Sequence, residues 1–292
     1  MEANVIDARF PDRRNESDSN LKNAQQVMLR ILKIVDDICH RHDIDYWLDG
    51  GTLLGAIRHG GFIPWDDDMD IAMPRKDYER FLLVAARELP PGLFLQTAAR
   101  DPTYDAFAKP PCKIRDENSL IVEPFQRRLS DHPGLFLDIV PVDRVHLSDP
   151  EKNAELRMKK RYWRLCVLYN LRWEWSKNLK VNVRNMVSVT RYVIGLDFWL
   201  KRYMKKAERK IIRNKQLTEG YRFALGFDVP WVRFFDVEEI YPLQRIPFED
   251  GEFLAPHNCD SVLKKYYGDY MMIPPEEKRI SHANVLVPDR SR

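Results

Sequence analysis

Three aspartates at alternate positions, Asp66, Asp68 and Asp70, stand in one short acidic stretch of the chain. Alternate side chains of a β-strand share a face and lie about 6.6 Å apart along it, so these carboxylates can converge on one ligand. Like charges this close repel each other unless a cation neutralises them. Mg²⁺ or Mn²⁺ suits such oxygen ligands and leaves room for phosphate oxygens. The pattern therefore predicts a metal-binding strand over Asp66–Met73, and the simpler alternative is a solvated acidic loop.

The residues Gly50, Gly51 and Thr52 precede the acidic stretch and lead into a helix-compatible run, Leu53–Arg58. Glycine lacks a Cβ atom, so a ligand can approach the backbone closely here. A turn that opens a helix directs unpaired backbone N–H groups outward, and phosphate groups bind well to such groups. The sequence therefore predicts a phosphate cradle beside the metal-binding carboxylates.

Asp138 is a third chemical candidate, because it lies in the middle of an apolar, strand-like run, Leu135–Val142. A buried carboxylate is costly unless it is paired or binds a metal. We expect Asp138 to act as a general base or as a further metal ligand beside Asp68 and Asp70. The alternative is a structural carboxylate that pairs with a buried arginine.

Three motifs, Gly50–Asp70, Phe136–Asp143 and Tyr267–His282, extend over most of the chain. The first reads Gly-Gly-Thr-Leu-Leu-Gly-x-x-Arg, followed by Ile-Pro-Trp-Asp-x-Asp-x-Asp. Together the motifs resemble the LicD family of phosphotransferases, which are relatives of the fukutin group. The resemblance implies a nucleotidyltransferase-like fold and transfer of a phosphorylated small molecule from a CDP-linked donor to a glycan. It also favours the functional interpretation of Asp138.

Several basic residues are expected to help bind the donor. Lys113 and Arg115 are two positions apart, which places them on one strand face where they can meet phosphates, although an exposed basic pair on a sheet explains the spacing equally well. The resemblance adds Arg58, and a basic C-terminal segment that folds over the site adds Arg279 and His282. The predicted donor-binding residues are Gly50, Gly51, Thr52, Arg58, Lys113, Arg115, Arg279 and His282.

The elements that must position these residues include both helices and strands. Apolar residues recur at helical spacing over residues 28–39, and Ser19 or Asn20 can cap that helix. A second helix is expected over residues 77–89, and a turn at residues 249–251 indicates a β-hairpin. The sequence therefore predicts an α+β fold, with a nucleotidyltransferase-like mixed sheet flanked by helices.

The chain divides unevenly by charge. Residues 1–18 are polar and are predicted to form a flexible arm, whereas residues 19–292 form one catalytic domain. Within it, 19 Lys and Arg stand against five Asp and Glu between Glu151 and Lys215, which predicts a basic helical insertion at about 150–218. This insertion is expected to contact an anionic glycan, with or without a lipid anchor, or a membrane surface. A solvated basic face is the alternative, and no recognised motif supports nucleic-acid binding.

The four cysteines form no Cys-x-x-Cys pair, which argues against a structural zinc site and a disulfide framework. The N-terminus is polar and shows no signal peptide. No apolar run reaches the length of a membrane span. A cytoplasmic location is therefore expected, either free or peripheral to the membrane.

These expectations combine into one reaction. A phospho-alcohol, such as phosphocholine, is transferred from a CDP-linked donor such as CDP-choline to a hydroxyl of a cell-surface glycan, and CMP is released. The first alternative is a nucleotidyltransferase that attacks the α-phosphate of a nucleoside triphosphate. The second is a non-catalytic protein that binds glycan or lipid on the same scaffold, although intact Asp68, Asp70 and Asp138 favour catalysis.

Overall fold

The computed structural model describes most of the chain outside residues 147–218. The described residues are 9–101, 103–104, 111–123, 131–146, 219–226, 228–229 and 231–291, with isolated positions between 157 and 209. The expected helical insertion lies almost entirely outside the described residues, as do the first eight residues of the expected arm. The division into arm, domain and insertion therefore stays a prediction.

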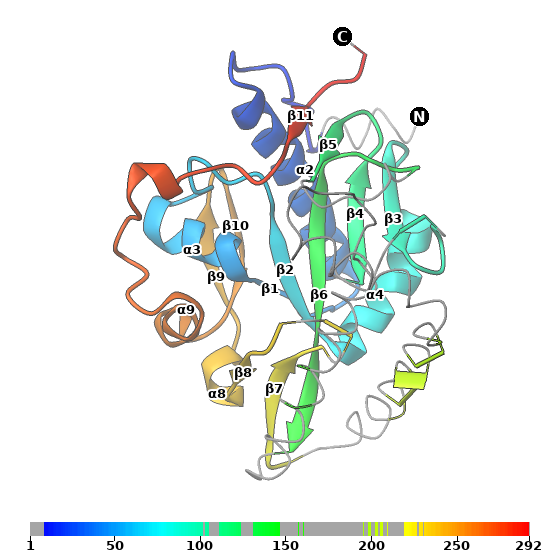
Figure 1. Ribbon diagram of the computed structural model, residues 1–292, viewed down its shortest axis with the longest axis vertical. Coiled ribbons are helices and arrows are strands. Elements are labelled where there is room, and N and C mark those ends of the chain that lie inside the picture. The colour runs from blue at the N-terminus through cyan, green and yellow to red at the C-terminus, as the bar shows by residue number, and fades with distance from the viewer. Residues whose placement is uncertain are drawn as a thin grey trace, which may run out of the picture.

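Figure 1 labels the helices and strands of the described residues. The helices are α2 (Asn20–Arg41), α3 (Gly50–His59), α4 (Arg75–Glu88), α8 (Val237–Ile240), α9 (Cys259–Tyr267) and the 3-10 helix η1 (Glu276–Lys278). The strands are β1 (Trp47–Leu48), β2 (Asp70–Pro74), β3 (Leu93–Thr97), β4 (Cys112–Asp116), β5 (Leu120–Val122), β6 (Phe136–His146), β7 (Tyr221–Leu225), β8 (Phe234–Phe235), β9 (Gln244–Phe248), β10 (Gly251–Ala255) and β11 (Val285–Val287).

A mixed sheet forms the centre of the fold, with the long strand β6 running through it (Figure 1). The strand order is β1-β2-β6-β4-β3, and β7 pairs with the far half of β6 and with β8. β2 and β6 run parallel, whereas the other described pairs of this sheet are antiparallel. This register sets Asp138 opposite Asp70 on one side and opposite Lys113 on the other. The expected mixed sheet flanked by helices is confirmed.

Helices α2 and α4 pack against one face of the sheet, behind it in Figure 1. The predicted apolar stripe of α2 is buried: Met28, Ile31, Leu32, Val35 and Ile38 are each at most 1 % exposed. Burying a side chain of this size contributes about 1.5–3 kcal/mol, so this stripe is a main source of core stability. The helix begins as predicted, because the side chain of its N-cap residue accepts a hydrogen bond from the first turn.

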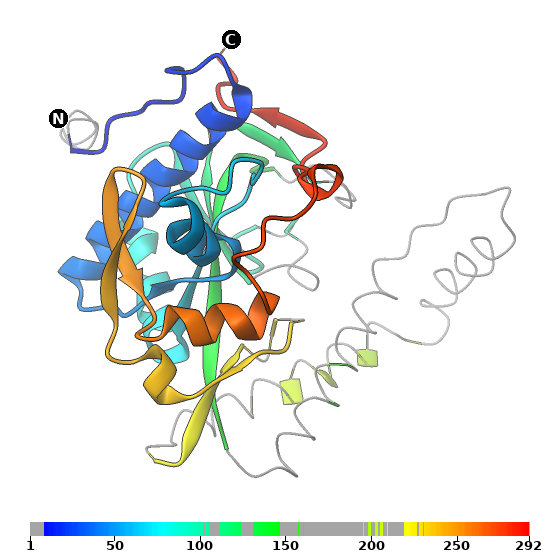
Figure 2. The same ribbon diagram turned by 90° about the vertical axis from the view of Figure 1, so that its left-hand side faces the viewer.

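Helices α3 and α9 and the β9–β10 hairpin lie together beside the β1 edge of the sheet (Figure 2). The predicted hairpin turn is confirmed between Phe248 and Gly251. Helix α3 comes so close to the following loop that a Cβ atom on Gly55 would lie 2.4 Å from the backbone oxygen of Gly61. A side chain at position 55 would displace the loop backbone, so this glycine allows the middle of α3 to pack closely against the loop.

The acidic stretch differs from the expectation in one respect. Strand β2 begins at Asp70, so the residues from Asp66 to Met69 precede the strand instead of forming its first half. The regular pairing with β1 and β6 extends only over β2, although the backbone N–H of Asp138 in β6 still donates to the backbone oxygen of Met69 at 2.8 Å. The alternation of side chains nevertheless persists, because Met69 and Asp67 are buried while Asp66 and Asp68 are partly exposed.

Candidate active site

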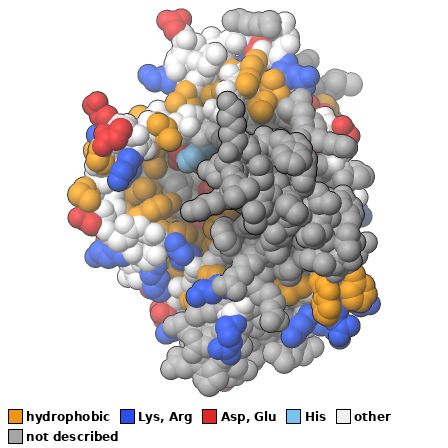
Figure 3. Space-filling model, viewed as in Figure 1, with side chains coloured by type: hydrophobic (Ala, Val, Ile, Leu, Met, Phe, Trp, Pro, Cys, Tyr) orange, Lys and Arg blue, Asp and Glu red, His pale blue; other side chains and the backbone are white. Residues whose placement is uncertain are grey.

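A pocket of about 410 Å³ opens where the N-terminus of α3, the start of β2 and the C-terminal segment meet. Figure 3 shows acidic and histidine side chains in a hollow bordered by hydrophobic ones. The lining residues are Asp49, Gly50, Gly51, Leu54, Ile63, Trp65, Asp66, Asp68, Asp70, Val140, Leu225, Trp231, Arg233, Tyr266, Tyr267, Lys278, Ile280 and His282.

The acidic stretch and the glycine pair meet in this pocket. A Cβ atom on Gly50 would lie 3.4 Å from Oδ2 of Asp70, and one on Gly51 would lie 3.0 Å from Oδ2 of Asp66. Gly50 has φ +53°, a conformation that glycine adopts most readily. The structure thus brings the carboxylates against the first turn of α3, where backbone N–H groups lack helical partners.

Thr52 ties this helix turn to the acidic strand. Its Oγ1 accepts a hydrogen bond of 2.8 Å from the backbone N–H of Asp70, and the N–H of Asp49 donates to the backbone oxygen of Asp70 at 3.1 Å. Thr52 is buried and is absent from the pocket lining. Its side chain therefore positions the site, while a contact between it and a donor stays a prediction.

Burial raises the pKa values of the pocket carboxylates, and neighbouring negative charges add to the rise for Asp66 and Asp70. Burial, together with the charge of Asp68, raises the pKa of Asp66 to about 9. Burial also raises the pKa of Asp70 well above its usual range, with the charges of Asp68 and Asp138 adding to the effect. Such groups ionise readily only when a positive charge joins them, so the environment suits a divalent cation.

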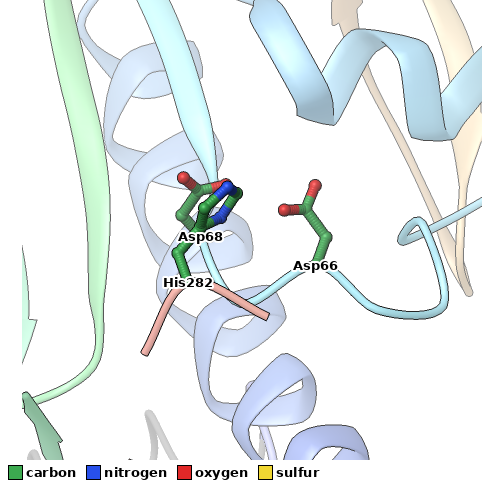
Figure 4. Close-up of side chains that lie close together, drawn as sticks. All are labelled: Asp66, Asp68 and His282. Atoms are coloured by element: carbon green, nitrogen blue, oxygen red, sulfur yellow. The ribbon is translucent and has the colours of Figure 1, made fainter. Parts of the chain in front are cut away.

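The donor atoms also fit such a cation. One ligand atom each from Asp66, Asp68 and His282 lies within 4.8 Å of the others, and Figure 4 shows the three side chains converging. Asp70 lines the same pocket. Carboxylate oxygens suit Mg²⁺ and Mn²⁺, and an imidazole nitrogen is compatible with Mn²⁺. The residues present therefore fit the metal that the sequence predicts.

Asp138 is buried and pairs with a lysine instead of an arginine. Nζ of Lys113 lies 2.6 Å from Oδ1 of Asp138 and 3.2 Å from the ring centroid of Phe136. Burial raises the pKa of Asp138 to about 6, and Lys113 opposes that rise. Lys113, which was expected to bind donor phosphates, thus forms an ion pair with Asp138, and it is only 1 % exposed.

The other predicted basic residues also make contacts within the protein. Arg115 is buried in the sheet, where it donates to Oε1 of Gln96 and to the backbone oxygen of Gly134. Arg58 donates to the backbone oxygen of Tyr270, and Arg279 donates to that of Pro274. The structure brings His282 to the pocket but places these three arginines outside its lining, so their role in donor binding stays a prediction.

Sequence reasoning missed several residues of the pocket. Asp49 is buried beside the glycine pair and accepts hydrogen bonds of 3.0 and 2.8 Å from the hydroxyl of Tyr266. Arg233 adds positive charge to the lining, as does Lys278 of the basic C-terminal segment that was expected to fold over the site. The position of Asp49 directly before Gly50 was a usable signal, because a helix N-terminus favours acidic neighbours. Arg233 had no such signal, since only tertiary packing brings it there.

The sheet, the paired carboxylates and the glycine-opened helix define a nucleotidyltransferase-like site. Residues 43–120 match the family described as "LicD/FKTN/FKRP, nucleotidyltransferase domain". The chain is also 29 % identical over 266 residues to the lipopolysaccharide cholinephosphotransferase LicD of Haemophilus influenzae, covering 90 % of this chain and 95 % of that protein. These matches confirm the resemblance of the chain to the LicD family.

Two further relatives match this chain over a short stretch only. The chain is 56 % identical over 34 residues to the ribitol 5-phosphate transferase FKRP of Homo sapiens, which covers 12 % of this chain and 7 % of that protein. The FKRP of Mus musculus matches equally over 34 residues. The likeness to these relatives is therefore limited to a short motif and does not extend to the rest of the chain.

Two further observations bear on the surroundings of the site. Among the described residues, no helix is both long and apolar enough to cross a membrane. Cys39, Cys112 and Cys259 are buried free thiols. The described cysteines therefore form no disulfide with one another.

Proposed function

We propose that this chain transfers a phospho-alcohol from a CDP-linked donor to a glycan hydroxyl and releases CMP. The chain is a phosphotransferase of the LicD type, as its family and its named relatives are. The observation that supports a CDP-linked donor is that Asp66, Asp68 and Asp70 lie beside the N-terminus of α3 in one pocket. Acidic and phosphate-binding groups placed side by side suit a diphosphate held through a divalent cation.

In this proposal Asp68 and Asp70 hold Mg²⁺ or Mn²⁺ at the donor. The bound cation neutralises charge on the diphosphate and on the departing CMP. Backbone N–H groups of Gly50 and Gly51 orient the phosphate oxygens. Lys278 and Arg233 supply positive charge at the pocket wall.

Asp138 accepts the proton of the acceptor hydroxyl or orients that hydroxyl in the same proposal. A pKa of about 6 leaves most of the carboxylate ionised at neutral pH, as a general base requires. Lys113 holds the side chain in one orientation through their ion pair. Donor phosphate binding by Lys113 is therefore not part of the proposed mechanism.

The relatives indicate only the chemical class of the transferred group, which we call the cargo. One named relative transfers phosphocholine and another ribitol 5-phosphate, so we propose phosphocholine or a similar phospho-alcohol. Aromatic rings of Trp65, Trp231 and Tyr267 line the pocket and can contact the cation of a quaternary ammonium group. The acceptor proposed here is a cell-surface glycan, reached from the cytoplasm or from the membrane surface.

The test is incubation with CDP-choline, Mg²⁺ and a glycan acceptor, with mass detection of the acceptor. We expect CMP to appear in step with an acceptor that gains phosphocholine. CDP-ribitol and other CDP-alcohols, tested in parallel, identify the cargo. Absence of CMP release with every CDP-alcohol would reject the proposal.

A nucleotidyltransferase reaction is the second candidate, because the matched domain is described by that name and the same carboxylates serve both reactions. The two differ in which phosphorus is attacked. If the nucleotide itself appears on the acceptor, with pyrophosphate or the cargo phosphate released, the second candidate stands.

A further inference from the structure

We propose that His282 completes the cation-binding group with Asp66 and Asp68, and that Asp67 is the positioning residue that holds His282 there. The inference rests on the proposed function because it concerns the same pocket. It goes further in two ways. It makes Asp66 and Asp68 cation ligands but Asp67 a positioning residue, and it adds His282, from the C-terminal segment, as a further ligand.

Asp67 points away from the pocket and into the C-terminal segment. It is 1 % exposed. Its carboxylate accepts hydrogen bonds from the hydroxyl of Ser281 at 2.6 Å and from the backbone N–H groups of His282 at 3.1 Å and Ala283 at 2.5 Å. Hydrogen bonds to an ionised acceptor are among the stronger ones in proteins. Three of them on one buried carboxylate fix the backbone of this segment.

The backbone anchor explains where the imidazole lies. The side chain of His282 is 71 % exposed, so packing alone does not hold it beside the acidic residues. Its Cα position is nevertheless set by the hydrogen bonds that Asp67 accepts. Asp66 and Asp68 flank Asp67 in sequence and face the pocket, so one short irregular segment both anchors the C-terminal segment and presents the two carboxylates.

The ring orientation adds a second geometric argument. Nδ1 of His282 lies 3.4 Å from Oδ1 of Asp67. Metal-binding histidines commonly direct one ring nitrogen to a carboxylate while the other binds the ion, and the carboxylate fixes the tautomer. Asp67 therefore occupies the position of the outer carboxylate, and Nε2 is the nitrogen assigned to the cation.

The rest of the C-terminal segment is held independently of Asp67. β11 pairs with β5, and the N–H of Asn284 donates to the backbone oxygen of Val122 at 2.8 Å. On the other side, Arg58 binds the backbone oxygen of Tyr270. Loss of the Asp67 carboxylate should therefore release residues 281–283 locally and leave the fold in place.

The ligand set makes a prediction about metal preference. Carboxylates alone suit Mg²⁺ and Mn²⁺ alike, whereas an imidazole nitrogen favours Mn²⁺ over Mg²⁺. A change in protein stability would not alter that preference selectively. The ratio of Mn²⁺ to Mg²⁺ affinity is therefore a direct measure of His282 as a ligand.

The test measures Mn²⁺ binding by electron paramagnetic resonance, with Mg²⁺ as competitor, on the full chain. His282→Ala should weaken Mn²⁺ binding about tenfold or more and change Mg²⁺ binding much less. Asp67→Asn and the milder Ser281→Ala should weaken Mn²⁺ binding in that order, and Asp67→Asn should add little in the His282→Ala background. His257→Ala, a change at an exposed histidine elsewhere, is the control.

Limited trypsin digestion supplies a readout that does not depend on metal. Cleavage after Lys278 or Arg279 should become faster in Asp67→Asn and stay unchanged in His282→Ala. Unchanged Mn²⁺ affinity in His282→Ala would overturn the inference. So would a double variant, Asp67→Asn with His282→Ala, whose loss of Mn²⁺ affinity equals the product of the two single losses. If these results appear but no CDP-alcohol is turned over, the inference stands and the proposed function fails.

Discussion

Asp70 and Asp138 lie opposite each other on the parallel strands β2 and β6. This pairing joins two parts of the chain that are distant in sequence and sets both carboxylates at one end of the sheet. Burial raises the pKa of Asp70, and the charge of Asp138 adds to that rise. A cation bound beside these carboxylates would lower the pKa of Asp70.

The first prediction concerns the carboxylates assigned to the metal. Asp68→Asn or Asp70→Asn should lower kcat about 100-fold or more, because a neutral amide is a weak ligand for Mg²⁺. The apo-protein should keep or gain thermal stability, since the change removes repulsion between buried charges. The measurement is CMP release at saturating Mg²⁺, with thermal unfolding in parallel.

Asp18→Asn, at an exposed position, is the control for the loss of one carboxylate. It should leave turnover unchanged. Turnover near that of the wild type in either pocket variant would remove Asp68 and Asp70 from the proposed metal site.

The second prediction separates catalysis from stability at Asp138. Asp138→Asn should cost about 3–5 kcal/mol of unfolding free energy, because it leaves the buried Lys113 without its charge partner. The double variant Asp138→Asn with Lys113→Met should regain most of that stability. Turnover should stay low in both variants, which urea unfolding and CMP release together would test.

A neighbouring ion pair on the same strand provides the contrast. Asp143 accepts hydrogen bonds of 2.7 and 3.1 Å from Arg75, and both side chains are buried. Asp143→Asn should destabilise the fold by less than Asp138→Asn, because Arg75 keeps Asp228 as a charge partner, and turnover per folded molecule should be retained. Recovered activity in the Asp138/Lys113 double variant would instead make Asp138 a structural residue.

These two ion pairs show where sequence reasoning reached its limit. The sequence predicted that a carboxylate in the apolar β6 run needs a partner, and the structure supplies one for Asp138 and another for Asp143. The identity of each partner depends on which strands pair, and parallel pairing of β2 with β6 could not be read from residue types. The expected arginine partner exists, but it belongs to Asp143.

Local patterns predicted the local structure well. The apolar spacing of α2 and the turn of the β9–β10 hairpin are confirmed because both depend on residues close in sequence. Strand alternation places Asp67 on the face opposite Asp66 and Asp68, and Asp67 is buried. Its hydrogen bonds to residues 281–283 could not be predicted, since no sequence pattern reports a contact between such distant segments.

The third prediction concerns pH. Burial raises the pKa of Asp49 to about 6, against about 3.9 in an unfolded chain. The folded state therefore binds this proton more tightly than the unfolded state. The stability it confers is full below about pH 4 and is lost as pH rises towards 6.

Asp49→Asn lacks this titration. The unfolding free energy of the variant minus that of the wild type should therefore become more positive by about 2–3 kcal/mol between pH 4 and pH 7. Urea unfolding at several pH values measures the difference directly, so other titrating groups cancel. A difference that stays constant with pH would show that Asp49 ionises normally in the folded protein.

The last prediction compares two glycines of α3. A Cβ atom on Gly55 would lie 2.4 Å from the backbone oxygen of Gly61, which cannot move without displacing the chain. Gly55→Ala should therefore destabilise the fold by about 1–3 kcal/mol. A Cβ atom on Gly51 would instead meet Oδ2 of Asp66 at 3.0 Å, and that side chain can rotate.

Gly51→Ala should consequently keep the stability of the wild type while displacing Asp66 from its place beside the helix N-terminus. The expected result is a weaker Mn²⁺ affinity and a higher KM for the donor, with unchanged urea unfolding. Gly55→Ala should show the reverse pattern at temperatures where it stays folded, with reduced stability and donor affinity near that of the wild type. Equal effects of the two variants on donor binding would mean that the glycine pair has no special contact with the ligand. The comparison thus tests whether the first turn of α3 contributes to ligand binding, while the middle of the helix contributes to the stability of the fold.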